Sequence, residues 1–314
     1  MYKIKTLISV IIFLIPLINY GQYTDEINSN RPGETMSAFG VGKSVFQIES
    51  GIYGITENHS VLNYDANGLG IDMTLRWGLF MEKLELIADF QYQYEVFNPA
   101  VLYPDRSAFK QTILGAKYLI YDPFKNNEKN INLYSWKAKH SFKWRQLIPA
   151  VSVFAGANIT LADNPYYFSA EAAISPKVIL IAQNHLGDGS WVFITNIIAD
   201  YIGTDYPSYG YGITLTKGFS RKWSGFIENQ GYMSDFYSDA IVRGGAAFLI
   251  HNDLQVDASI SSSLKDTPSI LYGGIGFSWR YDANYKEVRM KVDTGDSEKK
   301  EKIKPAKTIK EQKK

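Results

Sequence analysis

The clearest pattern in the chain is an alternation of apolar and polar side chains on both sides of a short break. Successive side chains of a β-strand point to opposite faces, so a period of two predicts strands over residues 71–79 and 84–96, joined as a β-hairpin. Each arm is long enough to cross a bilayer at a tilt, which takes about 9 to 11 residues. Only Ile87 breaks the alternation. The apolar face comprises Ile71, Met73, Leu75, Trp77, Leu79, Leu84, Leu86, Ala88, Phe90, Tyr92, Tyr94 and Val96.

The opposite face of this hairpin is charged. Pairing Leu79 with Leu84 sets Arg76 diagonally between Glu85 and Asp89. Two interpretations follow. In a soluble sandwich the apolar face points into a core and the charged face into water. In an outer-membrane barrel the apolar face points into lipid and the charged face into the lumen.

The same alternation recurs along the chain and gives twelve predicted strands in all. A polar loop is expected at residues 56–68, between the first strand and the hairpin. We predict an all-β fold, an antiparallel transmembrane β-barrel over residues 44–285. The other strands are expected at residues 45–52, 111–120, 146–159, 175–185, 191–202, 209–219, 223–232, 240–251, 254–264 and 270–282.

Two observations favour the membrane barrel. An even number of strands returns both termini to one side, expected to be periplasmic, and the connections on that side are mostly short, as in bacterial barrels. The exception is residues 122–145. Aromatic residues also sort by strand end into two belts, as membrane interfaces require. The predicted inner belt is Trp77, Trp191, Trp223 and Trp279, and the outer belt is Tyr92, Tyr94, Tyr201, Tyr211 and Tyr232.

The ends of the chain differ from its middle. Residues 1–21 have the basic, apolar and small-residue regions of a signal peptide, with a buried N-terminal helix as the alternative. Residues 22–43 are rich in Gly, Pro and Ser and predict a loop or a plug segment inside the barrel. Residues 286–314 contain 11 basic and 6 acidic residues and predict a disordered periplasmic tail. The signal peptide together with the predicted barrel gives the outer membrane as the expected location.

The insert at residues 122–145 has two interpretations. Leu133, Trp136, His140 and Trp144 fall near one helical face among basic residues, which favours a short interfacial helix. An aromatic-rich loop is the alternative.

Composition limits the chemistry. A net charge of +1 excludes a bulk nucleic-acid binder, and the expected partners are membrane lipid, a small solute and, during insertion, the barrel-assembly machinery. The absence of Cys and of an HExxH pattern argues against a metal site. No His falls in mid-strand beside a Ser, so we expect neither an enzyme nor a cofactor. A lipid hydrolase is the weakest alternative. The four histidines are His59, His140, His185 and His251.

The charged residues of the predicted inner face are the candidate solute path. Both signs are present, so these residues either line a passage or pair with one another and fill a narrow interior. Twelve strands lie between filled barrels of about eight strands and aqueous porins of about sixteen. The candidates are Glu49, Asp72, Arg76, Glu85, Asp89, Glu95, Lys117, Glu228, Arg243, Asp257 and Arg280.

Residues 30–51, NRPGETMSAFGVGKSVFQIESG, resemble the opening signature of the outer-membrane barrel family described as the putative MetA-pathway of phenol degradation. The stretches LRWGLFMEKLEL and LGAKYLI are similar to two later motifs of that family. The family's leading Asp is Asn30 here. The matching motif residues are Arg31, Pro32, Thr35, Ser37, Gln47 and Glu49.

The resemblance implies that the predicted barrel is an outer-membrane transporter or channel for small apolar, aromatic or amphiphilic molecules. The alternative is a non-conducting barrel with a structural or assembly role, which would use its tail and the 122–145 insert for periplasmic contacts.

Overall fold

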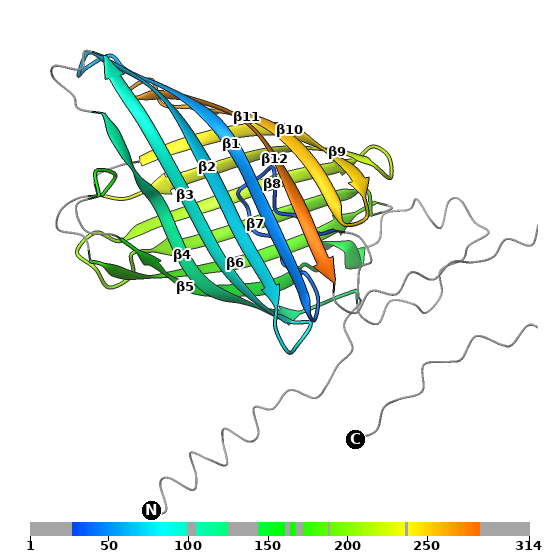
Figure 1. The fold of residues 1–314 in the computed structure, drawn as a ribbon. Helices are drawn as coiled ribbons and strands as arrows, with labels where there is room; N and C mark the ends of the chain where they lie inside the picture. Colours follow the sequence, from blue (N-terminus) through cyan, green and yellow to red (C-terminus); the bar gives the residue numbers. More distant parts are fainter. Residues whose placement is uncertain are drawn as a thin grey trace, which may run out of the picture. The chain divides into compact units, whose positions relative to one another are not determined.

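The computed structural model describes residues 27–98, 105–124, 144–160, 164–167, 172–187, 189–235 and 238–282. Within these residues twelve strands form one closed antiparallel barrel, in which each strand pairs with its neighbour in sequence and β12 pairs with β1 (Figure 1). The predicted twelve-stranded barrel is confirmed. The strands are β1 (Val45–His59), β2 (Tyr64–Gly78), β3 (Leu84–Asn98), β4 (Arg106–Tyr121), β5 (Ala150–Ile159), β6 (Ile174–Leu186), β7 (Trp191–Asp200), β8 (Ser208–Gly218), β9 (Trp223–Met233), β10 (Ser238–His251), β11 (Leu254–Ser263) and β12 (Ser269–Asp282).

The predicted hairpin has the expected register. Trp77 of β2 lies opposite Leu86 of β3, and Met73 lies opposite Phe90. Because side chains alternate across each strand, this register puts the apolar set of both arms on one face and the charged set on the other.

The barrel is inside out relative to a soluble protein. Large apolar side chains on the outer face are exposed, for example Ile275 at 60% and Ile227 at 67%. Charged side chains on the inner face are buried, with Glu228 at 0% and Glu49 at 1%. The sheet closes on itself, so these outer side chains meet no second sheet and suit a hydrocarbon surrounding.

Three strands are several residues longer than predicted: β4 begins at Arg106 and not at residue 111, and β1 and β2 extend towards each other. The polar stretch 56–68 is not a loop, because pairing between β1 and β2 continues through Glu57 with Ala66 and His59 with Tyr64. Only residues 60–63 connect the strands. A strand end that extends beyond the bilayer meets water on its outer face, so its sequence loses the apolar alternation and reads as a loop.

Strand β5 begins later than predicted. Residues Trp144–Leu147 form a 3-10 helix, η1, and β5 starts at Ala150. Pro149 lies directly before this start, and its ring fixes φ and removes the N–H that a strand ladder would use. The side-chain amide of Gln146 instead donates to the carbonyl oxygen of Gly187 at 2.6 Å.

The barrel has two ends, which we call the near end, where β1 begins and β12 ends, and the far end. All four predicted Trp residues lie at the near end and are exposed, and Tyr92, Tyr94 and Tyr211 are exposed further towards the far end. Tyr232 was wrongly predicted for the outer belt. It shares the inner face with Glu228 and Gln230, and its hydroxyl donates to Gln230 Oε1 at 3.2 Å. Tyr201 lies just beyond the end of β7.

Several predictions lie outside the described residues. These are the signal peptide, residues 22–26 of the loop or plug segment, residues 125–143 of the insert with Leu133, Trp136 and His140, and the tail at residues 286–314. Within the described ranges, no helix combines the length and apolarity needed to cross a membrane.

Candidate functional site

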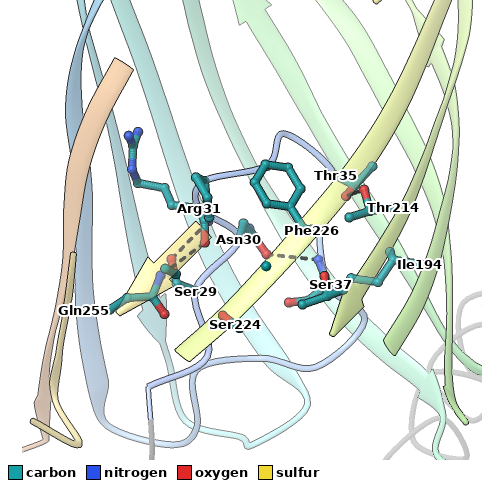
Figure 2. A pocket seen from close by; sticks show the side chains of 15 residues that line it. Ser29, Asn30, Arg31, Thr35, Ser37, Ile194, Thr214, Ser224, Phe226 and Gln255 are labelled. Atoms are coloured by element: carbon teal, nitrogen blue, oxygen red, sulfur yellow. Dashed lines mark hydrogen bonds between the residues drawn. The ribbon is translucent and has the colours of Figure 1, made fainter. Parts of the chain in front are cut away.

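Residues 27–43, which we call the lumen segment, lie inside the barrel (Figure 2). At one end of the segment the N–H of Ile27 donates to the carbonyl of Asn252, in the turn between β10 and β11, at 2.8 Å. Just after the other end, the N–H of Ser44 donates to the carbonyl of Gly78, where β2 finishes, at 2.8 Å. Both contacts are at the near end, so the chain enters and leaves the barrel through the same opening.

Arg31 of the lumen segment bridges two strands that are distant in sequence. Its guanidinium donates to Asp257 of β11, with Nε 3.3 Å from Oδ2 and Nη2 3.2 Å from Oδ1, and it also donates to Asp72 of β2. The wall residues beneath the guanidinium are Gly51 and Gly276, where an added Cβ would overlap Arg31. The wall therefore lacks side chains where this arginine lies.

Glu49 of β1 holds the backbone beside Arg31. Its carboxylate accepts the N–H of Asn30 at 3.1 Å and the N–H of Arg31 at 3.3 Å. It also accepts Nη1 of Arg76 at 2.8 Å and Nε2 of Gln47 at 2.7 Å. A buried carboxylate requires partners of this kind, because an unpaired charge away from water is strongly destabilising.

A buried network of charged side chains adjoins Glu49 and consists of Arg76, Glu85 and Lys117. Arg76 Nε donates to Glu85, and Lys117 Nζ lies 3.0 Å from Glu85 Oε2. Lys117 also donates to the carbonyls of Ser37 and Phe39 in the lumen segment, at 2.9 and 3.1 Å. The predicted approach of Arg76 to Glu85 is confirmed. These side chains are thus bound by one another and by the backbone of the segment.

Glu228 of β9 binds the other side of the lumen segment. Its carboxylate accepts the N–H groups of Glu34 and Thr35 at 3.1 Å, and Arg243 Nη1 lies 2.8 Å from it. Figure 2 shows Thr35 pointing to Thr214 of β8, and each of these hydroxyls donates to Glu228 Oε2, at 3.0 and 2.7 Å. Two carboxylates from separate strands, Glu49 and Glu228, therefore cap consecutive backbone N–H groups of one segment.

The rest of the lumen segment packs against an apolar region of the inner wall that the sequence reasoning missed. The N–H of Ala38 donates to Gln183 at 2.8 Å, and its carbonyl accepts Ser152 Oγ at 2.6 Å. Two signals in the sequence pointed to this apolar region: Ile87 breaks the alternation of β3, and strands β6 and β7 are apolar on both faces. Around Ala38 lie Ile87, Ile113, Leu119, Ala150, Phe154, Ile179, Ile181 and Ile194, with Met36 and Phe39 of the segment against them.

Most of the predicted lumen residues meet at the lumen segment. Pro32, within the segment, lines a small cavity between the segment and the wall, and Gln47 donates to the carbonyl of Asn28. Among the described contacts, three predicted residues do not touch the segment. Asp89 accepts Gln111 Nε2 at 2.6 Å and Thr74 Oγ1 at 3.0 Å, and Glu95 pairs with Arg106. Arg280 lies at the near end of the barrel. Those that contact the segment, directly or through one partner, are Glu49, Asp72, Arg76, Glu85, Lys117, Glu228, Arg243 and Asp257.

A cavity of about 100 Å³ separates the lumen segment from the wall of β7 to β11. Its lining includes Arg31, Thr35 and Phe226 (Figure 2). Sites for small organic ligands have volumes of about 300 to 1,000 Å³. At the level of the segment, this gap is therefore too small for such a solute.

Of the described histidines, His59 and His251 lie at strand ends, and only His185 contacts the lumen segment. His59 is at the far end of β1, and His251 is at the near end of β10. The His185 ring contacts Phe39 and Phe124, with centroids 5.8 and 4.9 Å away. In the described part of the chain, no three His, Asp or Glu side chains are grouped as metal ligands would be. His140 lies outside it.

Comparison with solved structures gives the fold. The COG4313 outer membrane channel from Pseudomonas putida F1 is 11% identical, with a TM-score of 0.53, and the match covers 79% of this chain and 100% of that one. The CymD monoaromatic hydrocarbon channel is 10% identical, with a TM-score of 0.43 and coverage of 77% and 90%. The translocator domain of the autotransporter NalP from Neisseria meningitidis is 10% identical, with a TM-score of 0.42 and coverage of 76% and 89%. The barrel thus matches the fold of outer-membrane proteins.

Comparison with curated proteins found no match. A family model does match, over residues 29–281, a range that includes residues 29–43 of the lumen segment and the strands from β1 to all but the last residue of β12. The chain therefore belongs to the family described as "Putative MetA-pathway of phenol degradation".

Proposed function

We propose that this protein is an outer-membrane channel for small solutes, and that the lumen segment closes it in the state described above. The observation that carries the proposal is that the wall has glycines where the segment lies. An added Cβ at Gly51 or Gly276 would overlap Arg31, and one at Gly212 would come within 2.5 Å of Thr35. Without the segment, these wall positions carry no side chain to fill the space, and a lumen is left.

The contacts that hold the lumen segment suit a reversible closure. Its backbone and Arg31 are bound mainly by carboxylates, Lys117 and hydroxyl groups, all of which water can replace. A hydrogen bond exchanged for bonds to water has a net worth of only about 0.5 to 1.5 kcal/mol, or about 1.5 to 3 kcal/mol when one group is charged. Because the segment enters and leaves at the near end, it can withdraw there without threading through the barrel.

The near end is proposed to face the periplasm. The connections there at residues 79–83, 187–190, 219–222 and 252–253 are short, with residues 122–149 as the exception, whereas the far end carries a long one at residues 160–173. Short periplasmic turns are usual in bacterial barrels. This orientation agrees with a signal peptide at residues 1–21 and a Gram-negative host. It leaves the tail at residues 286–314 in the periplasm and gives membrane lipid and the assembly machinery as partners.

The proposed solutes are small apolar, aromatic or amphiphilic molecules, as the family resemblance implies, and no catalytic role is proposed. The alternative is a barrel that never conducts and has a structural role. The strands alone do not separate these possibilities, so the test concerns the lumen segment itself.

A reversible cross-link tests the proposal. The chain has no Cys, so the double variant Thr35→Cys, Thr214→Cys carries a single pair, placed where the two native hydroxyls are in contact. In liposome-swelling and planar-bilayer assays, we expect solute flux from the reduced variant and little from the oxidised one. The single variant Thr214→Cys is the control and should not respond to oxidant.

The outcomes separate the two functions. Equal flux in the oxidised and reduced states would mean that the lumen segment does not close the channel. No flux in either state, from barrels whose folding is verified by heat-dependent electrophoretic migration, would favour the non-conducting barrel.

A further inference from the structure

Lys110 is placed in the lumen by an irregularity in β4. In the pairing with β3, Gln111 and Phe109 both have partners while Lys110 has none, which is the arrangement of a β-bulge. Bulges redirect side chains. The ammonium group of Lys110 accordingly reaches inward, where it donates to Gln93 Oε1 at 3.3 Å and to the Tyr272 hydroxyl at 3.4 Å.

The charge of Lys110 is held differently from the other cations on the inner wall. Its hydrogen bonds in the described part of the chain go to neutral oxygen atoms, and its ammonium lies 5.4 Å from the centroid of the Tyr272 ring. The remaining inward-facing Lys and Arg side chains of the described strands each have a carboxylate within 4.0 Å. These are Arg76, Arg106, Lys117, Lys177, Arg243 and Arg280.

Two tyrosines stand beside Lys110. The rings of Tyr53 and Tyr272 are 6.1 Å apart at an angle of 62° and form an aromatic corner. The Tyr53 hydroxyl donates to Gln93 Oε1 at 2.8 Å, the same atom that accepts from Lys110. The ring of Tyr53 lies against Gly70 of β2, where any Cβ would overlap it, so the ring rests on the wall. Gln93 thus fixes both a cation and an aromatic ring.

This corner lies on the far side of the lumen segment. Tyr53 follows Gly51, which is in contact with Arg31, by one inward-facing position along β1. The side chain of Glu34 in the lumen segment is 55% exposed. Lys110, Tyr53 and Tyr272 are partly exposed, so lumen space adjoins them.

We propose that Lys110, Tyr53 and Tyr272 form a binding subsite for a small aromatic carboxylate. The ammonium group offers a charge-assisted hydrogen bond to the carboxylate, and the two rings pack against the ligand's ring. A neutral ring would gain only the aromatic contacts, and a cation would be repelled by Lys110. The inference names the solute class of the proposed channel and rests on that function.

Benzoate binding to the full-length protein in detergent tests the subsite. By calorimetry or ligand-observed NMR, we expect benzoate to bind about tenfold more tightly than benzyl alcohol, and Lys110→Met to weaken benzoate binding about tenfold. Cyclohexanecarboxylate should bind more weakly than benzoate, because the aromatic contacts are lost. Lys110→Arg should retain binding. The control is Lys217→Met, since Lys217 on the outer face donates to Ser190 and should not affect binding.

Several results would overturn the subsite. These are no benzoate binding by the folded protein, equal binding by Lys110→Met, or loss of binding in Lys110→Arg. If Lys110→Met does not fold, Tyr53→Leu provides the second variant, and unchanged benzoate binding there would also refute the proposal. The outcome is separable from the channel function: flux without benzoate binding removes only the subsite, whereas binding without flux from the reduced cysteine variant removes only the channel.

Discussion

Replacing Arg31 with Met should open the channel. Arg31 is the only residue of the lumen segment whose side chain bridges two carboxylates among the described ion pairs, Asp72 and Asp257. Met keeps much of the side-chain volume but removes the charge and every donor. In the closed state Asp257, whose side chain is 1% exposed, would then be buried without its cation.

The size of the effect follows from these exposures. Breaking a buried ion pair by removing one partner costs about 3 to 5 kcal/mol. The Asp72 side chain is 26% exposed and that of Arg31 is 14% exposed, so part of this cost is relieved by water. We take about 2 to 3 kcal/mol, and this loss applies only to the closed state because both aspartates are hydrated once the segment withdraws. The closed-to-open ratio should fall roughly 30- to 150-fold.

Single-channel recording measures this change as an increase in open probability. The triple variant Arg31→Met, Asp72→Asn, Asp257→Asn should have a closed-to-open ratio about tenfold higher than that of Arg31→Met alone, since the unpaired carboxylates are gone. The control is Arg106→Met, because Arg106 pairs with Glu95 at 3.2 Å and has no contact with the lumen segment in the described contacts. An unchanged open probability for Arg31→Met, in a barrel that is folded and conducts when opened, would refute the reasoning.

Three further variants probe the wall. Lys117→Met should destabilise the closed state by about 3 kcal/mol and raise the open probability, because Glu85 then stays buried with Arg76 alone. An unchanged open probability would mean that the Lys117–Glu85 pair does not hold the segment closed. Gly276→Val should exclude Arg31 from its position and give a leaky channel, whereas Gly54→Val, where nothing lies within 4 Å of the added Cβ, should behave as wild type. Ile275→Arg on the outer face should lower the free energy of unfolding in lipid by about 2 to 4 kcal/mol, whereas Asn58→Arg, near the strand end, should lower it by about 0 to 1 kcal/mol. Equal losses would argue against a hydrocarbon band around Ile275.

The sequence was sufficient for the barrel because its outer face must be apolar and its inner face polar along each strand. That requirement predicted the register of Trp77 with Leu86 and the inward charges Glu49 and Glu228. The outer-belt prediction for Tyr232 was wrong because it followed the residue's position along the strand, whereas alternation from Glu228 puts Tyr232 on the inner face.

The partners of the lumen segment could not be predicted. Arg31 meets Asp72 and Asp257 because closure of the sheet brings β2 and β11 around one lumen, and period-two patterning gives no cross-barrel distances. The apolar inner wall around Phe154 was also hidden, since Ile113, Phe154 and Ile181 are apolar side chains at inner positions, where alternation predicts polar ones. The inward direction of Lys110 depends on a bulge, which alternation cannot place.

Backbone hydrogen exchange in lipid nanodiscs tests the central claim most directly, because the N–H groups of Asn30, Arg31, Glu34 and Thr35 all donate to buried carboxylates. We predict that a peptide covering residues 27–43 exchanges far more slowly than the connection at residues 60–63, and that Arg31→Met speeds its exchange without affecting the strands. Exchange of residues 27–43 at the rate of that connection in the wild-type protein would contradict a segment bound within the lumen.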